Sequence, residues 1–417
     1  MRSPNTPLLE QLSRAELIPL AYEYMMTGHL IDRALMPQVY LHGKSFDDVD
    51  NVAIDEWMGA SPNYTARLRA LLGIDGDDVS AMIKALQLDV GFVHQYMDVA
   101  YLVRDEHNAE FWLDHCGALL DVEPHGEGRV VGMCHHIEDP TFDATAFATN
   151  PRARIRPIHR PPRASQDRHP HCHWSIDIDP QRAPVEASNH TERVANFPLC
   201  DVAIVCATER LDDGLADYSG NLIPGFRLTD LSTDLLVAVM REFQMQVHLL
   251  TASAEAAISD RYGLGAARRI ARHQWIAASW VASERIAAAL DIAGGGVQAV
   301  AAMLAIHPGI PAGFERELEV DERAMSVNLK LTPEFEALLG VEQFGWIGQL
   351  ARAQTEGIAA MLHPVEPRAA VTSLRNTGTG IEISVTVDAT ADPALEPQSV
   401  ALAKISGTAR WEFDLGA

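Results

Sequence analysis

Apolar residues recur at helical spacing along much of the second half of the chain. The pattern runs through 235–250 and continues through 256–289, which predicts long helices. Two shorter segments, 174–179 in the first half and 381–387 in the second, alternate apolar and polar residues, which predicts strands. In each half the helices come first and the strands follow. This order predicts an α+β fold with antiparallel sheets.

The helical and strand patterns belong to a longer internal repeat. Trp57 aligns with Trp275 within a matching run of six residues, and the same offset pairs Arg67 with Arg285. The order of matches is kept further along, with small shifts of the kind that loops introduce: Leu72 with Leu290, Gly91 with Gly309, Ala118–Glu123 with Ala337–Glu342, Gly132 with Gly348, and Pro151–Ala153 with Pro367–Ala369. Chance similarity between alanine-rich helices is the alternative interpretation.

The repeat predicts two tandem copies of one unit. The first copy covers residues 1–210 and the second covers 233–417, and the turn-rich segment 211–232 is the expected linker. Two such copies could pack as an internal pseudo-dimer across a two-fold axis. The sequence leaves open whether the whole chain also forms a homodimer.

The charge of the chain narrows the range of partners. Its 417 residues include 33 basic and 57 acidic ones, a formal net charge of −24, which argues against nucleic acid or an anionic membrane as a partner. The five cysteines are an odd number, and the first seven residues lack the apolar core of a signal peptide. We therefore expect a cytoplasmic protein that acts on a small molecule.

The richest cluster of reactive side chains follows Met133. Cys134, His135, His136, Glu138 and Asp139 lie within six residues. A thiol beside imidazoles can become a nucleophile, with a histidine as base and a carboxylate to orient that base. Cysteine, histidine and carboxylate groups can also bind zinc, the one cofactor for which the sequence offers a candidate site. Cys134 as a small buried apolar residue is the alternative.

The internal repeat indicates which copy carries the function. The positions aligned with Cys134, His135, His136 and Glu138 hold Leu350, Ala351, Arg352 and Gln354. The fold of the second copy therefore does not need these groups. All five cysteines also lie in the first copy, so we expect the site there and a supporting role for the second copy.

Two nearby segments supply further candidates. In the strand 172–178, Cys172 shares a face with Trp174, Ile176 and Ile178, so it is expected to point toward the apolar side. In this alignment, the second copy carries Ile381 and Ile383 in place of Trp174 and Ile176. Arg154 and Arg156 could bind the carboxylate of a substrate, or could belong to a solvated strand edge that precedes a loop.

The Cys134 segment resembles the L-2-amino-thiazoline-4-carboxylic acid hydrolase-like family, here in a tandem-duplicated form. The similarity lies in the following residues: Cys134-His135-His136-Ile137-Glu138, Phe142, Asn150-Pro151, Cys172 and, in the second copy, Arg261-Tyr262-Gly263. An extra Asp139, a displaced Asn-Pro element and an Arg/Pro/His-rich loop at 160–170 depart from the family pattern. The resemblance implies a helical half followed by a sheet, and hydrolytic opening of a carbon–nitrogen bond in a small heterocycle.

Two classes of function follow. The first is a hydrolase of a carbon–nitrogen bond in a small cyclic or anionic substrate, in which Cys134 is the nucleophile and His135 or His136 is the base. Glu138 or Asp139 would orient that base, and Asn150 would donate to an oxyanion. A zinc variant uses Cys134, His136 and Cys172 as ligands. The second class is a non-catalytic binding or sensor protein, since related helical-plus-sheet units such as 4-vinyl reductase-like domains bind small molecules.

Overall fold

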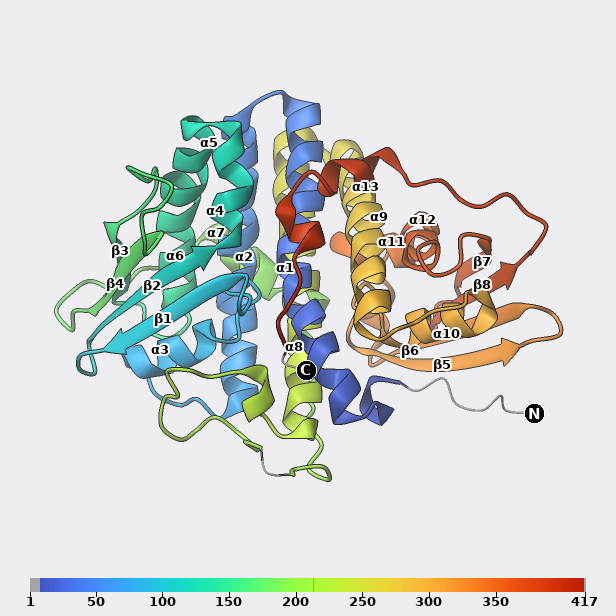
Figure 1. Cartoon of the computed structure of the whole chain (residues 1–417), viewed down its shortest axis with the longest axis horizontal. Helices are drawn as coiled ribbons and strands as arrows, with labels where there is room; N and C mark the ends of the chain where they lie inside the picture. Colours follow the sequence, from blue (N-terminus) through green and yellow to red (C-terminus); the bar gives the residue numbers. More distant parts are fainter. Residues whose placement is uncertain (1–7, 213, 416–417) are drawn as a thin grey trace.

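Four long helices form the centre of the molecule, and a four-stranded sheet lies on each side of them (Figure 1). The computed structural model describes residues 8–212 and 214–415, so the N-terminal seven residues used in the localisation argument lie outside it. The central helices are α1 (Arg14–Gly43), α2 (Phe46–Leu72), α8 (Thr233–Tyr262) and α9 (Leu264–Ala289). In the described part of the chain, no helix has both the length and the hydropathy needed to cross a bilayer.

The ends of the central helices are set by local side-chain chemistry. Ser13 and Glu16 form a capping box at the start of α1, in which the Ser13 backbone N–H donates to the Glu16 carboxylate at 2.8 Å. Ser232 caps α8 through its side-chain hydroxyl, which accepts from the Leu235 N–H at 3.3 Å. The apolar pattern runs through Gly263, but α8 and α9 are separate helices because Gly263 has a φ of +81°. A left-handed φ suits glycine and ends the helix.

The two sheets have the same strand order, which confirms the predicted α+β class and its antiparallel sheets. The first sheet is ordered β1-β2-β4-β3 and the second β5-β6-β8-β7, and every neighbouring pair is antiparallel. The strands are β1 (Met97–Val103), β2 (Asn108–Cys116), β3 (Ala153–His159), β4 (Cys172–Ile178), β5 (Phe314–Asp321), β6 (Ser326–Pro333), β7 (Ala369–Asn376) and β8 (Ile381–Val387).

The pairing of strands corrects the alignment of β4 with β8. Phe111 lies opposite Trp174 in the first sheet, and Leu329 lies opposite Ile383 in the second. Ile383 therefore takes the place of Trp174, two residues from the alignment made on sequence. Side chains repeat every two residues along a strand, so the shift left the expected faces unchanged. In both strands alternate residues are buried, as the sequence predicts for Cys172 and Trp174.

Shorter helices complete each half; some pack against the sheets and the others against the central helices. In the first half they are α3 (Val79–Leu86), α4 (Gly117–Val122), α5 (Glu127–Val131), a π-helical turn (Gly132–Ile137), α6 (Glu138–Phe147) and α7 (Asn189–Ala195). In the second half they are α10 (Gly296–Ile306), α11 (Gly345–Ala351), α12 (Glu356–Leu362) and α13 (Gln398–Ala403). Between the halves, Tyr218 in the expected linker is buried, and its carbonyl accepts from Lys84 Nζ at 3.0 Å.

The central helices of the two halves are interleaved. Helix α1 packs along α9, and α2 packs along α8, so each half lays its helices on those of the other. Two buried ion pairs also join the halves, one in each direction: Arg67 on α2 binds Glu242 on α8, and Arg285 on α9 binds Glu23 on α1. Each guanidinium contacts both oxygens of its carboxylate, at 2.6–3.0 Å. The largest apolar core correspondingly contains residues of both halves.

Candidate functional site

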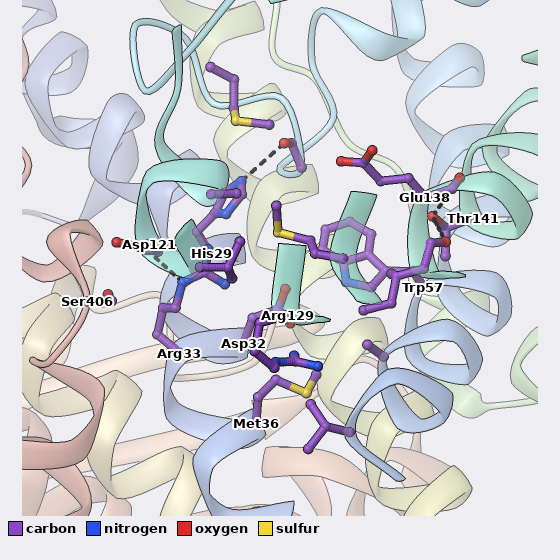
Figure 2. Close-up of a pocket in the computed structure, with 18 of the residues that line it drawn as sticks. His29, Asp32, Arg33, Met36, Trp57, Asp121, Arg129, Glu138, Thr141 and Ser406 are labelled. Atoms are coloured by element: carbon purple, nitrogen blue, oxygen red, sulfur yellow. Dashed lines mark hydrogen bonds and ion pairs between the residues drawn. The ribbon is translucent and has the colours of Figure 1, made fainter. Parts of the chain in front are cut away.

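A cavity of about 440 Å³ lies in the first half, between the central helices and the inner face of the first sheet (Figure 2). Its volume is within the range of small-molecule sites. Most of its wall is apolar or aromatic, with side chains from α1, α2, the segment between α3 and β1, the π-helical turn, α6 and β4: Met36, Ala53, Trp57, Phe92, Met133, Phe142 and Trp174. The outer part of the wall comes from the second half, through Leu402 and Ala403 of α13 and the following Ile405 and Ser406. We call this space the first-half cavity.

One face of α1 supplies the polar groups on one side of the cavity. His29, Asp32 and Arg33 are spaced so that they share a helix face, and Figure 2 shows them across the cavity from Glu138 and Thr141. His29 Nε2 lies 3.1 Å from the Gly91 carbonyl, and Arg33 Nε donates to Asp121 Oδ2 at 2.9 Å. Burial, together with the neighbouring Arg33 charge, lowers the pKa of His29 to about 4. His29 is therefore neutral at pH 7.

Asp32 forms a buried carboxyl pair with Glu56. Burial raises the pKa of both groups, and for Glu56 the neighbouring Asp32 raises it further. For Asp32 the positive charge of Arg33 and hydrogen bonding from Trp57 act in the opposite direction. Two interacting carboxyl groups in a buried site cannot both ionise readily. Glu56 therefore holds a proton, and Asp32 carries the negative charge when the pair ionises.

Glu138 lies on the other side of the cavity, at the start of α6. Part of its side chain lines the cavity, while Oε2 is buried and has no hydrogen-bond partner. Burial raises the pKa of Glu138 to about 8, although the nearby Arg160 charge opposes the rise. Arg160 is itself ion-paired with Asp139, so its charge is shared. Glu138 is therefore largely protonated at pH 7.

Replacing Glu138 by glutamine is expected to flatten the pH dependence of stability. The native carboxyl has a pKa of about 8 and the unfolded one about 4.5, so the native state holds the proton more tightly. Below pH 4.5 both states are protonated and the group has no effect. Between pH 4.5 and about 8 the wild type loses unfolding free energy as pH rises, at about 1.4 kcal/mol per pH unit.

Urea unfolding at several pH values between 5 and 8 measures this loss. The control is Glu127→Gln, because Glu127 is exposed on α5. Parallel pH curves for wild type and Glu138→Gln would contradict the assignment.

Of the residues selected from the sequence, Glu138 and Cys172 line the first-half cavity. Cys134 lies behind the wall and is 2% exposed. Burial raises the pKa of Cys134 well above its usual value, and the Glu138 charge adds to the rise. Burial and the Glu138 charge also raise the pKa of Cys172 well above its usual value. Both sulfurs are therefore thiols at neutral pH, which is unfavourable for a nucleophile.

The two histidines after Cys134 point away from it. His135 Nε2 lies 2.7 Å from the Pro161 carbonyl. The side chain of His136 is 61% exposed, and its Nδ1 lies 3.5 Å from Asp50 Oδ2. The structure thus separates the thiol from both expected bases. Asp139 is likewise engaged, by Arg160.

The three remaining candidates lie at the start of β3, outside the cavity lining. Asn150 uses its amide in a turn, donating to the Asp77 carbonyl at 3.0 Å and accepting from the Arg152 N–H at 2.9 Å. Arg156 binds both oxygens of Asp143 at 2.8 Å, and Arg154 Nη1 donates to the carbonyl of the preceding residue. β3 is an edge strand of the sheet, as in the alternative interpretation of this segment.

The proposed zinc ligands do not form a metal site. Across residues 8–212 and 214–415, no group of three or more histidine, cysteine, aspartate or glutamate side chains is placed to hold a metal ion. Cys134 and Cys172 are buried thiols, whereas the His136 imidazole is exposed. The three side chains do not converge on one point, so this donor set does not fit zinc. The expectation of zinc at Cys134, His136 and Cys172 therefore gains no support from the described residues.

The second half fills the space that corresponds to the first-half cavity. His248 and Trp275 hold the positions of His29 and Trp57 on the matching helices α8 and α9. The Trp346 ring lies between them, with its centroid 5.4 Å from His248 and 6.5 Å from Trp275. Trp346 is 1% exposed. A single indole from α11 thus occupies the second half where the first half is open.

Sequence reasoning missed the polar face of α1, although a signal was present. His29, Asp32, Arg33 and Met36 follow helical spacing along one face of α1. The helices α1 and α8 are both 30 residues long, which places Thr251 and Ala252 at the positions of Asp32 and Arg33. The second half therefore lacks the charged groups that the first half has at Asp32 and Arg33, just as it lacks those that follow Cys134.

Comparison of the chain with models of known families, with curated proteins and with solved structures finds no match in any of the three. The resemblance to the L-2-amino-thiazoline-4-carboxylic acid hydrolase-like family therefore stays a prediction. The function has to be argued from the cavity itself.

Proposed function

We propose that the protein binds a small, largely apolar molecule in the first-half cavity, as a binding or sensor protein. The observation that carries this proposal is the difference between the halves. The matching position in the second half is filled by Trp346, whereas the first half keeps about 440 Å³ open with buried polar atoms on its wall. An open space of this size lacks the packing contacts that a filled core would make. Stability alone would therefore favour a filled space.

A hydrolase is the second candidate, and Glu138 is the observation in its favour. A carboxyl with a pKa of about 8 in an apolar cavity is suited to proton transfer near neutral pH. In this version Glu138, and not Cys134, would exchange the proton with a substrate. Hydrolysis of a substrate that is lost in Glu138→Gln and kept in Cys134→Ala would support the hydrolase.

We further propose that the two halves arose by internal duplication. The common strand order, the equal lengths of α1 and α8, and the reciprocal ion pairs support this origin. A cytoplasmic location is also proposed, and the five free cysteines are consistent with its reducing conditions.

Filling the cavity is expected to abolish binding. Ala53 on α2 is buried and lines the cavity, so Ala53→Phe places a ring inside it. We expect wild type to bind the fluorescent probe N-phenyl-1-naphthylamine saturably, and Ala53→Phe to weaken binding by about tenfold or more, since the lost contacts are worth at least ~1.4 kcal/mol.

Ala66→Phe is the matched control, because Ala66 lies on the same helix and is exposed. This variant should bind as wild type does, and thermal unfolding of both variants checks that they fold. Equal probe binding in wild type and folded Ala53→Phe would place the binding site elsewhere.

A further inference from the structure

The cationic side chains on the wall of the first-half cavity already have carboxylate partners. Arg33 Nε is 2.9 Å from Asp121, and Arg129 Nη1 is 2.7 Å from Asp50. His29 is neutral, as shown above. Both arginines are therefore ion-paired, although Arg33 Nη2 is buried and has no hydrogen-bond partner.

The carboxyl groups of the wall are not all compensated. Asp89 has its oxygens satisfied by the Tyr64 hydroxyl at 3.0 Å and the Gly91 N–H at 2.7 Å. By contrast, Asp32 Oδ1 and Glu138 Oε2 are buried and have no hydrogen-bond partner. Leaving such an acceptor unpaired is unfavourable, and a ligand that donates to it would remove the penalty. Asp32 has an unpaired donor, Arg33 Nη2, as its neighbour in the chain, so Glu138 is the clearer unpaired acceptor of the cavity.

The surroundings of Glu138 favour a positive charge more than those of Asp32. Arg33 directly follows Asp32, and its unpaired Nη2 opposes a cation there. The charged groups that act on Glu138 are Arg160 and Asp139, which pair with each other, while its other titratable neighbours, Cys116, Cys134 and Cys172, are neutral thiols. Phe142 and Trp174 line the same cavity as Glu138, and the Arg160 guanidinium lies over the Trp174 ring at 5.8 Å from its centroid. A carboxyl group beside aromatic faces is a favourable environment for an ammonium group.

We propose that the ligand of the first-half cavity is a lipophilic cation, an amine or quaternary ammonium group on an apolar body, with its charge at Glu138. This inference rests on the proposed binding function. The apolar body would lie against Trp57 and the methionines of the wall. Because Glu138 is protonated in the free protein at pH 7, binding of the cation releases a proton to the solvent.

Three probes of one shape and different charge test the inference: 1-naphthylmethylamine as the cation, 1-naphthylmethanol as the neutral form and 1-naphthoate as the anion. Calorimetric titration at pH 7 should show the amine binding about tenfold more tightly than the alcohol, and the alcohol more tightly than the carboxylate. Repeating the amine titration in buffers of different ionisation enthalpy should show release of a proton.

Glu138→Gln should bring the amine to the affinity of the alcohol and abolish proton release, while the exposed control Glu127→Gln should change neither. Equal binding of the three probes, or tighter binding of the carboxylate, would overturn the preference for a cation and leave the binding function standing. Binding of none of them, together with no binding of N-phenyl-1-naphthylamine, would overturn both.

Discussion

Replacing Arg285 by methionine is expected to lower the unfolding free energy by about 3–5 kcal/mol. The side chains of Arg285 and Glu23 are both nearly buried, and the guanidinium contacts both carboxylate oxygens at 2.6 and 3.0 Å. Without Arg285 the Glu23 carboxylate remains in the core with no counter-charge. The Trp411 carbonyl, which accepts from Arg285 Nη1 at 2.7 Å, also loses its donor.

Urea unfolding measures the effect of Arg285→Met. Arg269→Met is the control on the same helix, because Arg269 is exposed, and it should change stability by less than about 0.5 kcal/mol. The double variant Glu23→Gln, Arg285→Met should recover part of the loss, since it removes the stranded charge. An effect below about 1 kcal/mol for Arg285→Met would show that this pair behaves like a surface salt bridge.

Trp346→Ala is the second change for which a large effect is expected, again about 3–5 kcal/mol of unfolding free energy. The indole is buried between His248 and Trp275, and its removal leaves a void in the well-packed second half. Trp112→Ala is the control, since Trp112 is only partly buried on the sheet, and its cost should be clearly smaller.

Thermal and urea unfolding of both tryptophan variants compare the two costs. A void opened at Trp346 should also admit the apolar probe, so N-phenyl-1-naphthylamine should bind at a second site in folded Trp346→Ala. A small stability loss with no second binding site would mean that neighbouring side chains collapse into the space, and that Trp346 does not by itself close the second half.

The sequence predicted the fold where one local pattern decides the structure. Alternating residues placed Cys172 and Trp174 on the buried face of β4, because side-chain direction in a strand depends only on position along it. Local patterns were less informative at boundaries. The apolar spacing continues through Gly263, and only its left-handed backbone separates α8 from α9.

The site was harder to predict for a physical reason. Cys134, His135 and His136 are neighbours in sequence, but successive residues of a helix point in different directions, so the structure sends the thiol inward and the imidazoles elsewhere. The first-half cavity is assembled from segments far apart in the chain, including α13 of the second half. The cavity is also open because the first half has no large side chain at the place that Trp346 fills in the second half. An empty volume cannot be recognised from any single residue of the sequence.

The outer wall of the first-half cavity has a consequence for the two halves. Leu402 and Ile405 reach the cavity from the second half, while Glu138 and Trp57 belong to the first. A molecule held there touches both and acts as a non-covalent clamp between them. By mass action such a ligand stabilises the joined arrangement by an amount that grows with its concentration. Ligand occupancy is thereby tied to how firmly the interleaved helices hold together.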